Sequence, residues 1–214
     1  VLGGWIADRL IGQRNAVVTA ADLAQLPDLK LIAVAATGTD NVDVAAARER
    51  GIEVANIQNY AIETVPEHCF MLMLALRRNL LAYRADVEAG KWQRSERFCL
   101  LDHPIGDLAG SRIGIVGYGA LGHKVAHLAR AFGMEVCVAS RSPGADPGVT
   151  VLPLPELLST CDIVSLHLPL NDQTRNMIGA AELATMKRTA LLINTARGGL
   201  VDENALLTLL DEGH

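Results

Sequence analysis

Three glycines follow a short apolar run at a spacing that suits the binding of a dinucleotide pyrophosphate. The apolar run covers residues 111–116, and Gly117, Gly119 and Gly122 come directly after it. We expect Gly117 to make a tight turn, Gly119 to let the backbone approach a pyrophosphate, and Gly122 to let a helix pack on the strand. A helix that begins at this turn directs its free N–H groups and its positive dipole end toward the phosphates. The pattern predicts a β-turn-α-β dinucleotide site.

The residues at the end of the second strand of this unit distinguish the two nicotinamide cofactors. An acidic residue about 20 positions beyond the glycines binds the ribose 2′-hydroxyl of NAD, whereas an arginine accommodates the 2′-phosphate of NADP. Ser140 occupies that position, and Arg141 and Ser142 follow it. No carboxylate stands there to repel a phosphate, and a guanidinium between two hydroxyls can bind one. The sequence favours NADP(H), and NAD(H) is the alternative if Arg141 is an ordinary solvated residue.

Two further residues at strand ends are candidates for chemistry. Arg197 follows the apolar run 190–194 and precedes two glycines, so its forked cation can reach the crevice outside the strands and bind a carboxylate. An isolated arginine is more often a surface ion-pair residue, but its place at the predicted crevice favours a binding role. His167 lies in an apolar strand, where a hydrogen-bonded histidine near the cofactor is expected rather than a general acid or base. The sequence contains no metal-ligand spacing and no G-x-S-x-G motif.

Apolar runs and amphipathic stretches alternate along the chain, which predicts a parallel, doubly wound α/β sheet that positions these residues. The expected strands are 16–19, 31–36, 52–56, 111–116, 134–140, 162–169 and 190–194. The expected helices are 6–11, 21–26, 44–50, 64–88, one from the glycine turn to 132, 154–159, 180–186 and 202–210. The helix from Thr64 is expected to start with a capping box to Glu67 and to end near Gly90, and residues 91–107 are expected to form a loop or arm.

Composition excludes several classes of protein. The chain has 214 residues, of which 50% are hydrophobic and 20% are charged, as in ordinary globular proteins. A net charge of −5 gives no electrostatic footprint for nucleic acid or an anionic membrane. The longest apolar stretch, 69–76, is too short to span a bilayer. The four cysteines have neither disulfide nor metal spacing, which favours a reducing cytoplasm.

Several segments together resemble the D-isomer-specific 2-hydroxyacid dehydrogenases over nearly the whole chain. The stretch FCLLDHPI at 98–105 is most similar to the glycerate dehydrogenase/hydroxypyruvate reductase branch of that family. The segments that carry the resemblance are ATGTDNVD at 36–43, EH at 67–68, LAG at 108–110, the glycine turn at 117–122, HLPL at 167–170 with Thr174, and NTARGGLVDE at 194–203.

The resemblance implies an oxidoreductase that transfers hydride between a nicotinamide cofactor and a small 2-oxo or 2-hydroxy acid. Hydroxypyruvate/glycerate and glyoxylate/glycolate are the expected substrate pairs. It also implies a partial flavodoxin-like substrate domain over 1–62, a dinucleotide-binding domain with a linker helix and arm over 63–214, an active site in the cleft, and a homodimer built through the dinucleotide-binding domain.

The resemblance further implies which residues form the site. Arg197 would be the catalytic arginine that binds the substrate carboxylate and carbonyl, and backbone N–H groups around Thr37 and Gly38 would hold the same carboxylate. The implied cofactor-binding residues are Gly117, Gly119, Ala120, Leu121, Gly122, Ser140, Arg141, Ser142, His167, Leu168, Pro169, Thr174, Thr195, Ala196 and Arg197.

The catalytic His and Glu of the family lie downstream of the segment that ends here, and His214 does not match their motif. We therefore expect a chain truncated at both ends that alone binds dinucleotide better than it turns over substrate. A phosphoglycerate or D-lactate dehydrogenase is an alternative, which an Asp at position 140 and a different 98–105 segment would have favoured. A non-enzymatic, dinucleotide-sensing corepressor is a second alternative, against which an intact Arg197 argues.

Overall fold

The computed structural model describes residues 17–141 and 146–213 of the chain. The chain divides into two compact units between Ala61 and Ile62, one residue from the boundary that the sequence predicts. The helical turn expected at 6–11 lies outside the described residues, as does Ser142. Each unit is built around its own apolar core.

The first unit is a two-stranded parallel sheet with two short helices. Its elements are α2 (Ala20–Ala24), β1 (Leu31–Val34), α3 (Val44–Glu49) and β2 (Glu53–Asn56), and β1 pairs with β2 from Leu31 opposite Glu53 to Val34 opposite Asn56. The expected strand at 16–19 is wrong over its described part, because Val18 makes only an isolated bridge to Val42. Thr19 instead forms a capping box with Asp22, which turns the chain into α2 directly after Val18.

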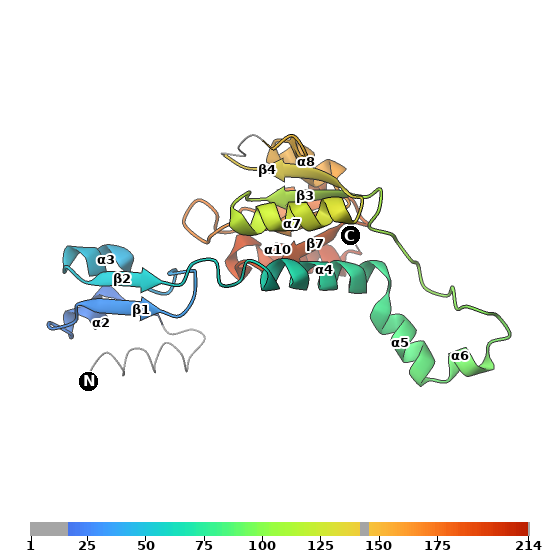
Figure 1. Cartoon of the computed structure of the whole chain (residues 1–214), viewed down its shortest axis with the longest axis horizontal. Coiled ribbons are helices and arrows are strands. Elements are labelled where there is room, and N and C mark those ends of the chain that lie inside the picture. Colours follow the sequence, from blue (N-terminus) through green and yellow to red (C-terminus); the bar gives the residue numbers. More distant parts are fainter. Residues whose placement is uncertain (1–16, 142–145, 214) are drawn as a thin grey trace. The chain divides into compact units, whose positions relative to one another are not determined.

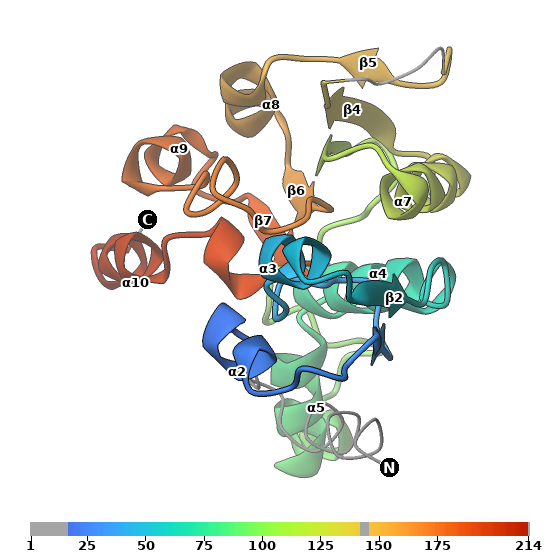
Figure 2. The same cartoon turned by 90° about the vertical axis from the view of Figure 1, so that its left-hand side faces the viewer.

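The second unit is a five-stranded parallel sheet between two layers of helices, so the predicted doubly wound fold is confirmed. Helices α4 (Thr64–Arg77) and α7 (Ala120–Ala131) share a core with one face of the sheet, and α8 (Leu154–Thr160), α9 (Ala180–Thr185) and α10 (Glu203–Asp211) are on the other (Figures 1 and 2). The strands are β3 (Arg112–Val116), β4 (Glu135–Ala139), β5 (Thr150–Val151), β6 (Ile163–Leu166) and β7 (Leu191–Asn194).

The strand order β5-β4-β3-β6-β7 defines where a ligand can bind. The chain builds outward from β3 to β5 and then returns to place β6 on the other side of β3. In such sheets the crevice at the carboxyl ends of the strands, where the order reverses, binds the ligand. The order therefore places the candidate crevice between β3 and β6. The two-residue strand β5 was not among the expected strands.

The long helix expected from 64 to 88 is wrong in two respects. Its N-cap is Glu63 rather than Thr64, and no side chain caps it. The helix is also interrupted at Asn79, which has φ = 48°, before it resumes as α5 (Leu80–Glu88). Asparagine tolerates this left-handed conformation better than most residues, and its side-chain amide donates a hydrogen bond to the Pro104 carbonyl. The break redirects the chain into an arm.

The arm, residues 79–107, consists of α5, the short helix α6 (Lys91–Arg94) and a returning loop. Its distal part is held by charges, since the Asp86 carboxylate accepts hydrogen bonds from Lys91 Nζ (3.1 Å) and His103 Nε2 (2.9 Å). The hydrogen bond from Lys91 lowers the pKa of Asp86. Arg78 pairs with Asp107 at the base of the arm over 2.6 Å. Residues 91–107, which were expected to form a loop or arm, contain the short helix α6 and the returning loop.

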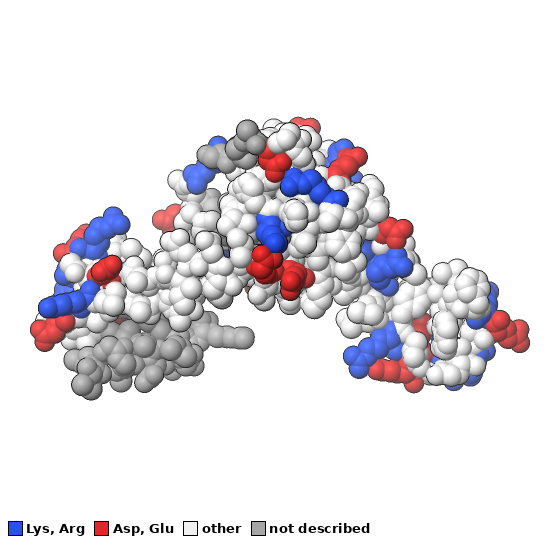
Figure 3. All heavy atoms as spheres, viewed as in Figure 1, with Lys and Arg blue, Asp and Glu red and all other residues white. Residues whose placement is uncertain are grey.

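Charged side chains of both signs are interleaved on the face shown in Figure 3, over both the sheet-containing body of the second unit and its arm. Part of the surface over α4 and α7 on this face is largely uncharged. Within the described part of the chain, no helix has the length and hydropathy needed to cross a bilayer.

Candidate functional site

Two of the three glycines after β3 are required by packing within the chain. Gly117 has φ = 96°, and a Cβ there would lie 2.6 Å from the carbonyl oxygen of His167. A Cβ on Gly122 would lie 2.3 Å from the carbonyl oxygen of Gly117. The turn, the first turn of α7 and the end of β6 are therefore packed too closely for a side chain at either position.

Gly119 has a different environment. A Cβ on Gly119 would meet no atom within 4 Å, and its φ of −85° is open to any residue. It is the N-cap of α7, and no side chain caps this 12-residue helix. The uncapped N–H groups at the start of α7 and the open space beside Gly119 fit the pyrophosphate of a dinucleotide. Ala120 and Leu121, which the resemblance places over that group, form the first turn of α7.

The end of β4 carries the residues that would distinguish NAD from NADP. Ser140 is half-buried and Arg141 is exposed. Arg141 Nη1 donates a hydrogen bond to the side-chain oxygen of Gln173 over 3.3 Å. This hydrogen bond connects Arg141 to the segment after β6. Gln173 was not among the site residues expected from the sequence.

Tyr118, between the first two glycines, anchors the chain that leads into β5. Its ring is buried, and its hydroxyl donates to Asp146 Oδ2 over 2.6 Å. Arg130 on α7 pairs with the same carboxylate over 3.3 Å. Burial raises the pKa of Tyr118, and the Tyr118 hydrogen bond lowers the pKa of Asp146. Sequence reasoning missed this contact, for which the only signal was an aromatic residue inside a glycine turn.

His167 takes part in a buried polar network that joins α4, β6 and β7. Its Nε2 lies 2.9 Å from Ser165 Oγ, and its Nδ1 is buried without a hydrogen-bond partner. The Cys69 thiol lies 3.2 Å from Thr195 Oγ1 and also contacts Ser165. Burial raises the pKa of the Cys69 thiol and lowers the pKa of His167 to about 4. Both groups are therefore uncharged at neutral pH.

This network predicts a specific dependence of stability on pH. The unfolded chain protonates His167 near pH 6.5, whereas burial delays protonation of the folded chain to about pH 4. The stability that the neutral ring contributes is therefore complete above about pH 6.5 and is lost as the pH falls toward 4, by roughly 3 kcal/mol in total. Urea unfolding of the parent and of His167→Gln between pH 4 and 7 measures this contribution. The free energy of unfolding should fall more steeply with decreasing pH in the parent than in His167→Gln.

The exposed His127 on α7 provides the matched control for this experiment. His127→Gln makes the same change of side chain at an exposed position, so it controls for effects of the substitution that do not depend on burial. Equal slopes for the parent and for His167→Gln would contradict the assignment of a buried, neutral imidazole at position 167.

The segment after β6 folds into a compact turn. The Asn171 side-chain oxygen accepts hydrogen bonds from the backbone N–H groups of Gln173 (2.9 Å) and Thr174 (3.1 Å). Thr174 Oγ1 donates to the Pro169 carbonyl over 2.7 Å. Leu168, Pro169 and Thr174, which were expected beside the cofactor, are thus held in one turn at the carboxyl end of β6. The expected strand 162–169 is too long, because β6 ends at Leu166 and both His167 and Pro169 follow it.

Arg197 follows β7 on a loop that is organised by Asn194. Asn194 Nδ2 donates to the Arg197 carbonyl (2.8 Å), and Asn194 Oδ1 accepts from the Ala196 N–H (3.2 Å). Arg197 is extended, half-buried, and immediately precedes the short 3₁₀ helix η1 (Gly198–Leu200). Asp202 is the N-cap of α10, and its side chain accepts hydrogen bonds from the backbone N–H groups of Asn204 and Ala205. The asparagine thus fixes the backbone from which the arginine projects.

Thr37 and Gly38 belong to the first unit and follow β1. Thr37 Oγ1 donates to the Ile57 carbonyl (2.9 Å), and Asn56 Nδ2 donates to the Thr37 carbonyl (2.6 Å). These bonds tie the end of β1 to the end of β2. Among residues 17–141 and 146–213, no group of three His, Cys, Asp or Glu side chains is placed to hold a metal ion.

Comparison with known proteins gives the same family that the motifs indicate. Residues 70–214 match the model of the D-isomer specific 2-hydroxyacid dehydrogenase NAD-binding domain. The chain is 52% identical to a glycerate dehydrogenase of Methylorubrum extorquens over 213 residues, which are 97% of this chain and 67% of the relative. It is 40% identical to a glyoxylate reductase of Thermococcus litoralis over 89% of this chain and 59% of the relative.

A solved structure of D-lactate dehydrogenase from Aquifex aeolicus, complexed with NAD and lactic acid, is similar with a TM-score of 0.84 and 34% identity. The similarity covers 92% of this chain and 58% of that one. The chain thus spans about three fifths to two thirds of the length of these proteins. A family model that matches residues 70–214 and a relative with 52% identity settle the assignment: this chain belongs to the D-isomer specific 2-hydroxyacid dehydrogenase family.

Proposed function

We propose that this chain binds a nicotinamide dinucleotide, and that the protein to which it belongs reduces a small 2-oxo acid or oxidises the matching 2-hydroxy acid. The observation that carries the proposal is the open space at Gly119, beside an uncapped α7 and at the point where the strand order reverses. Nothing in the described chain requires glycine there, whereas a pyrophosphate on the helix N-terminus does.

Different residues of the site have different roles in binding and orienting the substrate. When bound, the dinucleotide supplies or accepts the hydride. Arg197 offers a planar, permanently charged donor for the substrate carboxylate and the neighbouring carbonyl oxygen. The backbone N–H groups at Thr37 and Gly38 are further candidate donors to a substrate carboxylate, as the resemblance to the family implies. His167 is buried and uncharged, so we assign it to holding the end of β6 rather than to proton transfer.

Hydroxypyruvate/glycerate and glyoxylate/glycolate are the proposed substrate pairs, which agrees with the names of the glycerate dehydrogenase and glyoxylate reductase relatives. Oxidation of NADPH and NADH is measured at 340 nm with hydroxypyruvate, glyoxylate, pyruvate and 3-phosphohydroxypyruvate. Preference for either of the first two supports the proposal, and preference for either of the last two supports a D-lactate or phosphoglycerate dehydrogenase. Dinucleotide binding without turnover of any of the four is expected both of a dinucleotide-sensing corepressor and of a chain without the catalytic His and Glu, and the presence of those two residues in the whole protein distinguishes the two cases.

The proposed cofactor is NADP(H), with NAD(H) as the alternative. Arg141, exposed at the end of β4, is the cation that would bind the 2′-phosphate. We expect Arg141→Ala to raise the dissociation constant for NADPH about tenfold, since a charge-assisted hydrogen bond contributes about 1.5–3 kcal/mol, and to change that for NADH less than twofold. Isothermal titration calorimetry with both cofactors measures this. Equal losses for NADPH and NADH would contradict 2′-phosphate binding by Arg141.

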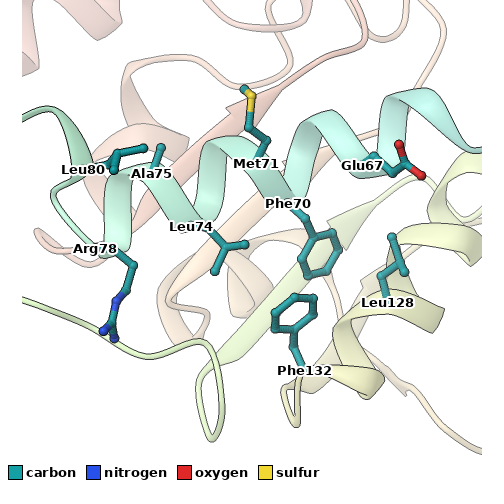
Figure 4. A pocket seen from close by; sticks show the side chains of 9 residues that line it. All are labelled: Glu67, Phe70, Met71, Leu74, Ala75, Arg78, Leu80, Leu128 and Phe132. Carbon is teal, nitrogen blue, oxygen red and sulfur yellow. The ribbon is translucent and has the colours of Figure 1, made fainter. Parts of the chain in front are cut away.

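We further propose a homodimer that forms through the surface of α4, α7 and the arm. A groove of about 610 Å³ lies between these helices, and the Phe70 and Phe132 rings stack inside it with centroids 5.0 Å apart (Figure 4). Leu81 and Phe98 on the arm have 74% and 93% of their surface exposed. Exposed apolar surface of this kind is typical of protein–protein interfaces, and a second copy supplies an equal apolar face.

Leu74 tests this interface, because it lines the groove and is 36% exposed. Leu74→Glu should halve the mass that multi-angle light scattering reports for the parent, since a buried carboxylate without a partner costs several kcal/mol. Leu76 is on the same helix and is 52% exposed, but it does not line the groove. Leu76→Glu should therefore keep the dimer. A parent that is monomeric at micromolar concentration would contradict the proposal.

A further inference from the structure

We propose that Gln173 is a specificity-determining residue, which positions the Arg141 guanidinium for a 2′-phosphate and keeps its charge available. The inference rests on the proposed NADP(H) binding and extends it to a residue outside the glycine turn and the β4 end. The observation is the hydrogen bond from Arg141 Nη1 to Gln173 Oε1, at 3.3 Å.

The topology gives this contact its significance. Arg141 follows β4 and Gln173 follows β6, and these strands lie on either side of β3. The hydrogen bond therefore joins the two segments that flank the carboxyl end of β3, where the glycine turn begins. A dinucleotide whose pyrophosphate lies at Gly119 extends its adenosine half toward the end of the second strand of the unit, which here is β4. The pair lies in the region that the adenosine ribose would reach.

The backbone that carries Gln173 is held in place by neighbouring hydrogen bonds. Asn171 Oδ1 accepts from the backbone N–H groups of Gln173 and Thr174, and Thr174 Oγ1 closes the turn on the Pro169 carbonyl. This arrangement is a side-chain-stabilised turn that restricts the backbone before any ligand binds. An acceptor on a restricted turn reduces the conformational entropy that the Arg141 side chain would lose on binding a phosphate.

The chemical nature of the acceptor determines the charge. A carboxamide accepts one hydrogen bond from Nη1 and carries no charge. The positive charge of the guanidinium is therefore not offset by Gln173, and its remaining donors can bind a phosphate. A carboxylate at the same position would pair with Arg141 and would also repel a 2′-phosphate. A neutral residue at position 173 thus favours NADPH, and an acidic residue there would shift selectivity toward NADH.

The experiment measures dissociation constants for NADPH and NADH by isothermal titration calorimetry, which needs no turnover. We expect Gln173→Glu to raise the NADPH constant about tenfold and the NADH constant less than twofold. Gln173→Met, which is similar in length but lacks the acceptor, should raise the NADPH constant about threefold. Gln25→Glu, an exposed residue after α2, makes the same change of charge in the first unit and should alter neither constant.

The outcomes separate this inference from the proposal on which it rests. If Arg141→Ala weakens NADPH binding but Gln173→Glu leaves the ratio of the two constants within twofold of the parent, Gln173 does not determine specificity and the proposed role of Arg141 stands. Tighter NADPH binding by Gln173→Met would also overturn the positioning role, since it would mean that Gln173 competes with the phosphate. A parent that binds neither dinucleotide overturns both.

Discussion

In the whole enzyme, replacing Arg197 with alanine is expected to lower kcat/KM for a 2-oxo acid by about a thousandfold. A charged, bidentate pair with a carboxylate in a site closed from water is worth about 4 kcal/mol, and each 1.4 kcal/mol is a factor of ten in rate. Arg197→Lys should lose most of the same activity, because an ammonium cannot donate two parallel hydrogen bonds from a planar fork. Steady-state kinetics with hydroxypyruvate and glyoxylate measure the loss.

Calorimetry tests the role of Arg197 without turnover. It compares the affinity of the dinucleotide-bound parent and of dinucleotide-bound Arg197→Ala for glyoxylate. This affinity should fall in parallel with kcat/KM, while the dissociation constant for the dinucleotide changes by no more than about threefold. Arg48 at the end of α3 is exposed and provides the control, since Arg48→Ala should match the parent in every measurement. Retention of glyoxylate affinity in Arg197→Ala would remove the arginine from the carboxylate site.

Gly119→Ala should separate ligand binding from folding. The new Cβ meets no atom of the chain, so the free energy of unfolding should fall by no more than about 1 kcal/mol, the usual cost of alanine at an N-cap. The same Cβ would occupy the space that a pyrophosphate needs, so the dissociation constant for the dinucleotide should rise at least about tenfold. Urea unfolding and calorimetry on the same preparation measure the two effects.

Gly122→Ala is the matched variant with the opposite expectation. Its Cβ would lie 2.3 Å from the Gly117 carbonyl oxygen, so the second unit should lose about 3 kcal/mol of stability as α7 moves away from the turn. If Gly119→Ala bound dinucleotide as tightly as the parent, the pyrophosphate could not lie where the proposal places it.

The elements with strong local signals were predictable. The apolar runs and glycines of β3, α7 and β4 specify a β-turn-α-β unit within one stretch of sequence, and the helix caps Asp43 and Asp202 are recognisable from residue type and position. In each case the determining contacts span only a few residues, so the local pattern contains the information that sets the structure.

The elements set by distant contacts were not predictable. Asn79 breaks the helix without a proline or glycine, and its conformation is accompanied by a hydrogen bond to Pro104, 25 residues away. The contact between Cys69 and Thr195 joins residues 126 positions apart. The pair of Ser165 and His167 was a partial exception, since His167 directly follows the last residue of β6 and residues two apart along an extended chain share a face. The contact from Arg141 to Gln173 required the positions of β4 and β6.

The break at Asn79 also has a consequence for local unfolding. Neither α5 nor α6 has a buried residue, so charge pairs and hydrogen bonds with the returning loop hold the arm rather than an apolar core. Opening such a segment exposes little new apolar surface and costs less free energy than opening the sheet. Amide hydrogens of α5 should therefore exchange with solvent ahead of those in α4, although the two helices are adjacent in sequence. A second subunit packed on the arm would slow that exchange, so the difference in amide protection between α4 and α5 would report subunit association.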